Sequence, residues 1–267
     1  MNLAHIVNII KIDDDIKASH LDIAQGVTLK SMSLANSLVC GSNQVELVAV
    51  THAKENVEIP NDFTWANTIS DYVWEFSPML RNHEPKRRFV RICDILNNGC
   101  ITSNSDFYIY SNIDIGLQPN FYNRIFDLLA HGYDGLAINR EDVPKEIDGR
   151  ILGEDDLEEI WKLPGKRHMG VDCVVFASRL FPKMEFGNVF VGAPPVGAVL
   201  LSQVRRNAKK FKWIKNERLT FHLGEDLAWM SESAKIYHIA NKIEAKGLRD
   251  DVFRETLFSR CLSIFQK

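Results

Sequence analysis

Paired cysteines, long apolar runs and an excess of one charge are all missing from this sequence. Its five cysteines are widely spaced among 267 residues and form no Cys-x-x-Cys pair. This argues against a disulfide framework and against a zinc ribbon, and it fits a reducing compartment. No apolar run approaches the roughly 18 residues that cross a bilayer. A formal net charge of -3 gives no global reason to expect nucleic acid as a partner.

The amino terminus, MNLAHIVNIIKIDDD, also lacks a basic region followed by a long apolar stretch and a small-residue cleavage site. We therefore expect a first strand there and a soluble, cytoplasmic protein. What is present is an ordinary globular composition, 45% hydrophobic and 25% charged. The length suits one large α/β domain or two small ones.

Short apolar runs alternate with helical patterns along the chain. Strands are expected over residues 6–12, 45–50, 107–115, 135–139, 172–177 and 219–223. Helices are expected over 28–39 and 87–96, after Pro119, after Pro194-Pro195, and in residues 231–267, whereas 52–85 are expected to be mostly loop.

This alternation predicts an α/β fold with a mixed, mostly parallel sheet flanked by helices. We expect one domain over 1–230 and a helical C-terminal extension, 231–267, packed on it. In open sheets of this kind, ligands lie beyond the carboxyl ends of the strands. The candidate positions are therefore the polar residues that end each apolar run: Asp13 to Asp15, Thr51, His52, Asn112, Asp114, Asn139, Arg140, His222, Glu225 and Asp226.

Asn112 and Asp114 end the apolar part of DFYIYSNIDIGLQPNFY. The strand period places both side chains on the same side of an extended chain. Two oxygen ligands at this spacing can converge on Mg²⁺ or Mn²⁺, with a diphosphate filling further positions. The alternative is that Asp114 only caps the turn before Pro119.

Two segments suit an anion. Arg140 follows Asn139 in GLAINR, where its guanidinium can bind a phosphate through two hydrogen bonds. The alternative is a surface ion pair with Glu141 or Asp142. The segment GNVFVGAPPVG, which includes Gly192, precedes a helix whose backbone N–H groups could meet an anion. It lacks the spacing and the lysine of a P-loop, and backbone geometry alone could explain most of its glycines.

Asp172 opens an apolar strand after Gly170, so a desolvated carboxylate there could serve as a general base toward an acceptor hydroxyl. Asp226, shortly before Trp229, is its rival for that role. A third interpretation is that both residues only cap helices or form turns.

The segment SNIDIGLQPNFY, with the strand before it and the helix after it, resembles the Asp-x-Asp region of GT-A glycosyltransferases. These are nucleotide-sugar transferases with a Rossmann-like domain. VNIIKI, GYDGLAINR, GVDCVVF followed by GNVFVGAPPVG, and FHLGEDLAW are similar to further parts of that scaffold, and in the expected order they cover most of residues 5–229. The departure is Asn112, which stands at the first acidic position and brings no charge. A lower metal affinity or a loss of activity would follow.

The resemblance implies transfer of a sugar from a nucleoside-diphosphate sugar to an acceptor hydroxyl, with Mn²⁺ or Mg²⁺ on the diphosphate. The ion would be held by Asp114, helped by Asn112 and His222. In glycogenin-like members a late histidine next to a glycine completes the metal site, and His222 looks similar. The alternative for His222 is a structural hydrogen bond. The segment around Gly192 would lie toward the acceptor, which could be a glycan, a lipid-linked molecule or a small molecule.

The run Asp13-Asp14-Asp15 also permits a different chemistry. Haloacid-dehalogenase-like phosphatases place an Asp-x-Asp after their first strand and use its leading carboxylate as nucleophile beside Mg²⁺. The hydroxyl residue expected shortly afterwards is missing, because Ile16-Lys17-Ala18 follows. Under the GT-A resemblance, Asp13 or Asp15 would instead bind the nucleotide base.

Residues 205–218 carry seven basic side chains against one acidic, interleaved with Phe211 and Trp213. Such a surface could make a peripheral contact with an anionic membrane or a lipid-linked acceptor. The alternative is a solvated helix end and loop. A further alternative concerns the whole chain: Asn112 would suit a non-catalytic nucleotide or sugar binder on the same fold.

Overall fold

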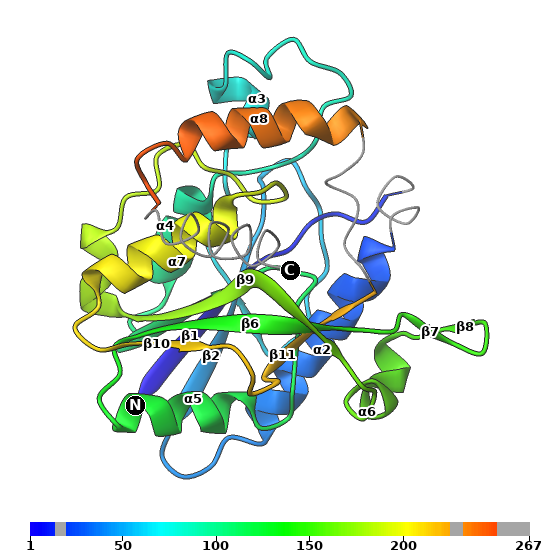
Figure 1. Ribbon diagram of the computed structural model, residues 1–267, viewed down its shortest axis with the longest axis vertical. Helices are drawn as coiled ribbons and strands as arrows, with labels where there is room; N and C mark the ends of the chain where they lie inside the picture. Colours follow the sequence, from blue (N-terminus) through cyan, green and yellow to red (C-terminus); the bar gives the residue numbers. More distant parts are fainter. Residues whose placement is uncertain (14–19, 225–231, 250–267) are drawn as a thin grey trace, which may run out of the picture.

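The computed structural model describes residues 1–13, 20–224 and 232–249, and in these ranges a nine-stranded sheet crosses the molecule (Figure 1). Its strands are β1 (Asn2–Asn8), β2 (Gln44–Val50), β3 (Phe63–Trp65), β4 (Phe107–Ser111), β5 (Gly116–Leu117), β6 (Gly135–Val143), β9 (Lys166–Ala177), β10 (Phe211–Ile214) and β11 (Thr220–Leu223). The strand order is β3-β2-β1-β4-β9-β6-β11-β5, and β10 also pairs with β6. A separate hairpin joins β7 (Glu146–Ile147) to β8 (Arg150–Ile151).

The strand directions place most carboxyl ends at one edge of the sheet. β1 is parallel to β2 and β4, and β6 is parallel to β10 and β11. β9 is antiparallel to both β4 and β6, so these two strands run in the same direction on either side of it. The amino-terminal end of β9 therefore lies at the same edge as the carboxyl ends of its neighbours. The expected mixed, mostly parallel sheet is confirmed.

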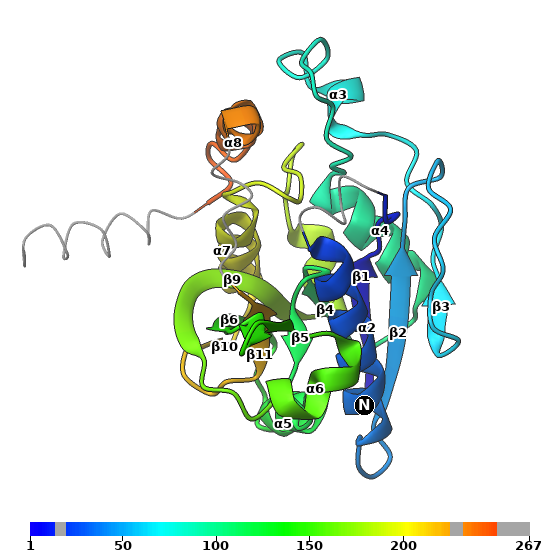
Figure 2. The same ribbon diagram turned by 90° about the vertical axis from the view of Figure 1, so that its right-hand side faces the viewer.

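Helices cover both faces of the sheet (Figure 2). The helices are α2 (Leu21–Ser37), α3 (Val73–Phe76), α4 (Ile92–Thr102), α5 (Phe121–Ala130), α6 (Leu157–Ile160), α7 (Val196–Asn207) and α8 (Lys235–Glu244), with 3-10 turns η1 (Glu154–Asp156), η2 (Ser178–Lys183) and η4 (Glu232–Ala234). Strand alternation divides the core: Leu3 and Val7 pack with α2 and α5, whereas Ala4 and Ile6 pack with α4 and α7. Burying each of the larger aliphatic side chains stabilises the fold by roughly 1.5–3 kcal/mol.

Several expected elements have different bounds in the structure. The strand expected over 107–115 ends at Ser111, so Asn112 and Asp114 follow it and do not lie in an extended strand. Three other differences arise from pairing. The helix expected at 87–96 begins only at Ile92, because Val90 bonds in extended form to Val191 and Phe89 stacks on Phe190. The strand expected at 172–177 starts at Lys166, since its polar first half pairs with the end of β6. Residues 211–214 form β10 where a surface segment was expected. In each case pairing with a distant segment outweighs the local pattern.

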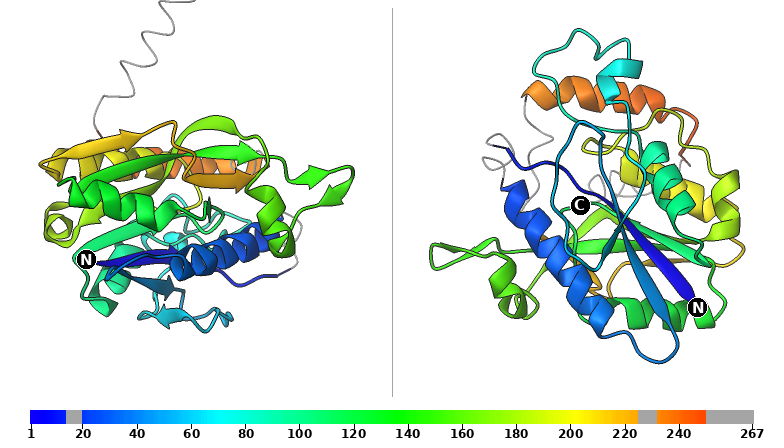
Figure 3. Two further views of the ribbon diagram at one scale, coloured as in Figure 1. Left: turned by 90° about the horizontal axis from the view of Figure 1, so that it is seen from below. Right: turned by 180° about the vertical axis from the view of Figure 1, so that it is seen from behind.

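α8 fastens two loops above the sheet (Figure 3). The Tyr237 hydroxyl accepts a hydrogen bond from the Arg87 backbone N–H at 2.8 Å and donates to the Pro85 carbonyl at 3.0 Å. The Asn241 amide binds backbone groups of Phe190 and Ala193 at 2.7–3.0 Å.

Residues 250–267 lie outside the described part, so the domain boundary at residue 230 stays a prediction. None of the helices in the described residues has the length and apolar character needed to span a membrane.

Candidate active site

The polar residues that end several strands meet at the carboxyl edge of the sheet. Asn112 and Asp114 follow β4, Arg140 lies in β6, Asp172 in β9 and His222 in β11. The strand register brings them together: Ser111 pairs with Cys173, and His222 stands opposite Asp142. Two register irregularities, one between Ile138 and Asn139 and one between Asn139 and Glu141, interrupt the pairing of β6 with β9 on either side of Asn139, the second at Arg140. Such bulges commonly redirect a side chain next to an active site.

A continuous chain of hydrogen bonds links five side chains of this edge. The Tyr110 hydroxyl donates to Asn112 Oδ1 at 3.0 Å, and Asn112 Nδ2 donates to Asp172 Oδ1 at 3.1 Å. Arg140 Nη1 then donates to Asp172 Oδ2 and its Nε to Asp142 Oδ1, both at 2.9 Å. The Arg140 side chain is only 6% exposed. Both oxygens of Asp172 are thus engaged, and Arg140 is a buried ion-pair partner of two carboxylates.

Asp114 and His222 form a second pair beside this chain. His222 Nε2 lies 3.5 Å from Asp114 Oδ2, and Nδ1 lies 3.0 Å from the Gly224 carbonyl. A carbonyl only accepts, so Nδ1 carries a proton and Nε2 faces the carboxylate. Burial opposes both charged forms, but each partner outweighs it: the pKa of His222 is raised by Asp114, and the pKa of Asp114 is lowered by His222 and Arg140.

The site contains more negative than positive groups. Burial raises the pKa of Asp172, with the nearby charge of Asp114 adding to it and that of Arg140 opposing it. Asp114, Asp142 and Asp172 all act electrostatically on the single guanidinium of Arg140, and together they raise its pKa against burial. A divalent cation would neutralise the excess.

The donor set at Asp114 and His222 fits such a cation. Asp114 Oδ1 is buried and meets no hydrogen-bond partner among the described residues, and a carboxylate with an imidazole suits Mn²⁺. Across residues 1–13, 20–224 and 232–249, no three His, Cys, Asp or Glu side chains are grouped to hold a metal by themselves. The two side chains would therefore need ligands from a substrate or from water. Asn112 is already used as the bridge between Tyr110 and Asp172.

Asn139 links the strands β9 and β10 beside the site. Its Nδ2 donates to the His168 carbonyl at 2.9 Å, and its Oδ1 accepts from Trp213 Nε1 at 2.5 Å. Both amide ends are thus held by neighbouring strands.

The sequence pattern did not identify three residues near the site, and they are of two kinds. Tyr110 and Asp142 share a strand side with Asn112 and Arg140, so the two-residue period could have found them. No sequence pattern points to His168.

The segment after β1 is fastened to neighbouring loops. Arg88 Nη2 lies 2.6 Å from Asp13 Oδ2 and donates to the Lys11 carbonyl at 3.2 Å. Glu55 accepts from the Lys11 backbone N–H at 2.6 Å and from the Tyr72 hydroxyl at 3.0 Å. Asp13 thus lies in the segment beyond the carboxyl end of β1, in an ion pair. Asp15 lies outside the described residues.

Gly192 belongs to a different neighbourhood. Its φ is +85°, and a Cβ would come within 2.3 Å of the Phe89 ring. Phe89 stacks on Phe190 and meets Tyr237 of α8 edge to face, so this loop packs beneath α8. The left-handed backbone explains the glycine without a ligand. Asp226 lies outside the described residues.

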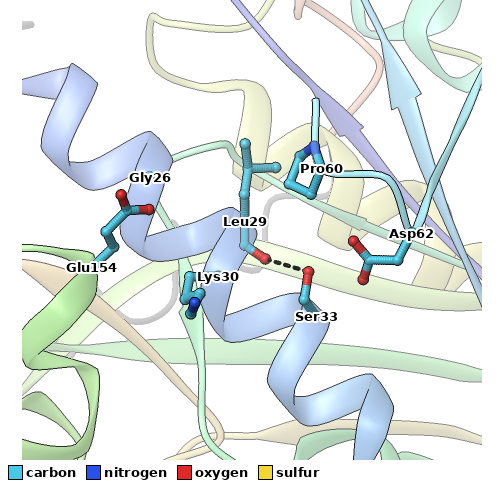
Figure 4. A pocket seen from close by; sticks show the side chains of 7 residues that line it. All are labelled: Gly26, Leu29, Lys30, Ser33, Pro60, Asp62 and Glu154. Carbon is cyan, nitrogen blue, oxygen red and sulfur yellow. Dashed lines mark hydrogen bonds between the residues drawn. The ribbon is translucent and has the colours of Figure 1, made fainter. Parts of the chain in front are cut away.

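An open cavity of about 410 Å³ lies against α2 (Figure 4). It is lined by Gly26, Leu29, Lys30, Ser33, Pro60, Asp62 and Glu154. Its one internal hydrogen bond, from the Ser33 hydroxyl to the Leu29 carbonyl, belongs to the helix itself. None of the predicted site residues that the structure describes lines this cavity, which is distinct from the Asp114 and Asp172 group.

His5 anchors the strand that leads into the site. It is fully buried in β1, with Nε2 2.9 Å from the Ser111 hydroxyl and Nδ1 2.8 Å from the Tyr122 hydroxyl. Burial lowers the pKa of His5 from 6.5 to about 3. Between these values the unfolded chain binds a proton that the folded chain does not. Its contribution to stability is complete above pH 6.5 and is lost as pH falls toward 3.

We therefore predict that in His5→Gln, whose amide can still bond to both hydroxyls, the free energy of unfolding depends less steeply on pH below 6.5 than in wild type. The wild-type free energy of unfolding should fall more steeply below pH 6.5, by up to about 1.4 kcal/mol per pH unit. Urea unfolding at several pH values measures both slopes. Equal slopes would show that His5 does not stay neutral in the fold.

No protein-family model matches the chain, and no curated protein matches it. Solved structures do. TarS 1-349 from S. aureus in complex with UDP matches at a TM-score of 0.50 and 9% identity, over 90% of this chain and 65% of that one. A longer TarS structure matches at 0.51 and 9%, over 92% of this chain and 39% of that one. The chain therefore spans less than two thirds of these neighbours.

These neighbours are GT-A glycosyltransferases. The chain has a GT-A-like fold. Glucosyl-3-phosphoglycerate synthase from Mycobacterium tuberculosis, in complex with Mn²⁺, UDP-glucose and phosphoglyceric acid, matches at a TM-score of 0.48 and 12% identity, over 93% of this chain and 81% of that one. The GT-A-like fold confirms the resemblance found in the sequence, and at such identities it establishes the architecture alone.

Proposed function

We propose that the protein transfers a sugar from a nucleoside-diphosphate sugar to an acceptor hydroxyl. The observation that carries this proposal is the partly buried Asp114–His222 pair beside Arg140, at the carboxyl edge of a GT-A-like sheet. Open α/β sheets bind ligands at this edge. The solved neighbours of this fold include TarS with UDP bound, which supports a nucleotide donor.

Asp114 and His222 would hold Mn²⁺ or Mg²⁺, which, when bound, stabilises charge that develops on the departing diphosphate. Arg140 adds a permanent positive charge close to Asp114. Its Nε and Nη1 are held by Asp142 and Asp172, which fixes the guanidinium before substrate arrives. Asp172, with both oxygens engaged, orients Arg140. The base for an inverting reaction would be Asp226, or Asp172 if it gives up one of its two hydrogen bonds to the acceptor hydroxyl.

The thermal unfolding midpoint, measured with UDP, GDP, CDP or dTDP and with or without Mn²⁺, tests the donor and the site together. A nucleotide at a hundred times its dissociation constant should stabilise wild type by about 2.7 kcal/mol. We predict that Asp114→Ala abolishes the Mn²⁺-dependent part of that shift. Asp127→Ala, an exposed carboxylate on α5, serves as the control and should retain it.

A Mn²⁺-dependent shift that persists in Asp114→Ala would place the cation elsewhere. A shift without transfer to any acceptor would favour the non-catalytic binder that Asn112 suggests. If no nucleotide acts, but Mg²⁺ with a phosphate mimic stabilises the protein and Asp13→Ala removes the effect, the protein is a phosphatase-like hydrolase instead.

The basic segment 205–218 is the part of the chain that would contact an anionic acceptor or a membrane surface. Several of its basic groups have partners: Lys210 lies 4.4 Å from the Tyr133 ring centre, and Lys212 lies 3.1 Å from Glu217. Lys215 lies 4.1 Å from the Trp213 ring centre. These contacts hold the cations at the surface near β10, where they could meet an anionic acceptor.

A further inference from the structure

The amide of Asn112 and the carboxylate of Asp172 behave as one unit. Their side chains share the 3.1 Å hydrogen bond from Nδ2 to Oδ1, and the Asn112 backbone N–H donates to the Asp172 carbonyl at 3.0 Å. Antiparallel pairing of β4 with β9 fixes both contacts, because Ser111 and Cys173 are direct partners. The other side-chain atoms are also bonded: Asn112 Oδ1 accepts from the Tyr110 hydroxyl, and Asp172 Oδ2 accepts from Arg140 Nη1.

Every polar atom in this unit has a directional role. Asn112 Oδ1 accepts from a hydroxyl, and Nδ2 must donate because its partner is a carboxylate. Asp172 accepts at both oxygens, from an amide and from a guanidinium. A carboxylate at position 112 would face Asp172 without a donor between them. Like charges at this separation repel strongly where water is scarce.

Position 172 and position 112 can exchange roles without changing this pattern. With aspartate at 112 and asparagine at 172, the amide at 172 would donate to the carboxylate at 112. The other end of residue 172, a carbonyl oxygen, would still accept from Arg140, and the carboxylate at 112 would still accept from Tyr110. These three side-chain hydrogen bonds persist, as does the backbone bond from residue 112 to residue 172, and only the location of one negative charge changes.

We infer that Asp172 supplies, from the neighbouring strand β9, the negative charge that position 112 lacks, and that Asn112 is the positioning residue that holds it there. The cation and the diphosphate would then face Asp114 from β4 and Asp172 from β9. This inference rests on the proposed function for its ligand. It explains why an uncharged residue at 112 is compatible with a working site.

The test is a cycle of Asn112→Asp, Asp172→Asn and the double variant, with Asn98→Asp on α4 as a control for the same replacement at a half-buried site. Thermal midpoints are measured without ligand. Nucleotide affinity is then measured by titration calorimetry with and without Mn²⁺, using the nucleoside diphosphate that stabilises wild type.

We expect Asn112→Asp to lower the midpoint by about 5 °C or more and the double variant to recover most of that loss. Asp172→Asn removes one carboxylate from a site with an excess of them and leaves Arg140 paired with Asp142, so its midpoint should stay closer to wild type than that of Asn112→Asp. It should weaken Mn²⁺-dependent nucleotide affinity by about tenfold or more, a loss of at least 1.4 kcal/mol. The double variant should return within about threefold of wild type. Recovery of cation-dependent affinity by moving a charge is a result that a purely structural role would not give.

The inference fails if wild type binds nucleotide with Mn²⁺ and the double variant is no better than the worse single variant. It also fails if Asp172→Asn binds as wild type does. If wild type binds no nucleotide, the proposed function fails together with the ligand role of Asp172, while the ligand-free midpoints still decide whether the two residues form one unit. If the midpoint losses of the two single variants simply add in the double variant, Asn112 and Asp172 do not form one unit.

Discussion

Replacing Arg140 with methionine should destabilise the protein by about 3–5 kcal/mol, because it removes one partner from a buried group of ions. The Arg140 side chain is 6% exposed and lies 2.9 Å from both Asp142 and Asp172. Methionine has similar length but leaves these carboxylates without a counter-charge. Denaturant unfolding at neutral pH measures the loss, which should shrink as the pH is lowered and the carboxylates take up protons.

Arg179→Met is the matched control. Arg179 also contacts an aspartate, with Nη2 2.6 Å from Asp134, but its side chain is 55% exposed. Asp134 keeps two backbone donors, the N–H groups of Lys209 and Lys210, when the arginine is lost. We expect a cost below about 1 kcal/mol there. Equal costs for the two replacements would mean that the carboxylates around Arg140 are solvated or protonated at neutral pH.

Arg140→Lys separates charge from geometry. A lysine restores one positive charge, yet a single ammonium cannot occupy the positions of Nε and Nη1 that serve Asp142 and Asp172 at once. Its stability should therefore fall between those of wild type and Arg140→Met. Nucleotide affinity should stay reduced, since Asp172 would lose its fixed partner.

The sequence pattern was sufficient to locate the edge of the sheet that carries the site. Apolar runs ending in polar residues pointed to the carboxyl ends of β4 and β11 and to Arg140 inside β6, and parallel strands bring such positions together. The prediction of Asn112, Asp114, Arg140 and His222 as neighbours follows from that rule. What each of them contacts does not follow from it.

The pairing partners depend on strand direction and on register, which local patterns leave open. β9 runs antiparallel between β4 and β6, and this direction places Asp172 against Asn112 and Arg140. The polar stretch before Asp172 carried no strand pattern, although it pairs with the end of β6. The surface ion pair considered for Arg140 and Asp142 exists, but in a buried setting. A register irregularity between β6 and β9 lies next to that pair, and such an irregularity is a feature of two strands rather than one.

Gly197 links the packing of α7 to this site. It lies at the start of α7, and a Cβ there would come within 2.2 Å of the Val171 carbonyl oxygen. That oxygen belongs to the backbone of β9, directly before Asp172, so it cannot move aside as a flexible side chain would. An added methyl group must push α7 and β9 apart.

We predict that Gly197→Ala destabilises the protein by about 2–3 kcal/mol, even though alanine favours a helix by about 1 kcal/mol over glycine. Displacing Val171 should also disturb Asp172, so nucleotide affinity should fall with stability. Gly26→Ala in the middle of α2 is the control, because its Cβ would meet only Glu154 at an ordinary 3.5 Å. There the change should be neutral or stabilising by up to about 1 kcal/mol. Thermal midpoints that rise in both variants would show that α7 has room to move away from β9, and that the packing of Gly197 does not set the position of Asp172.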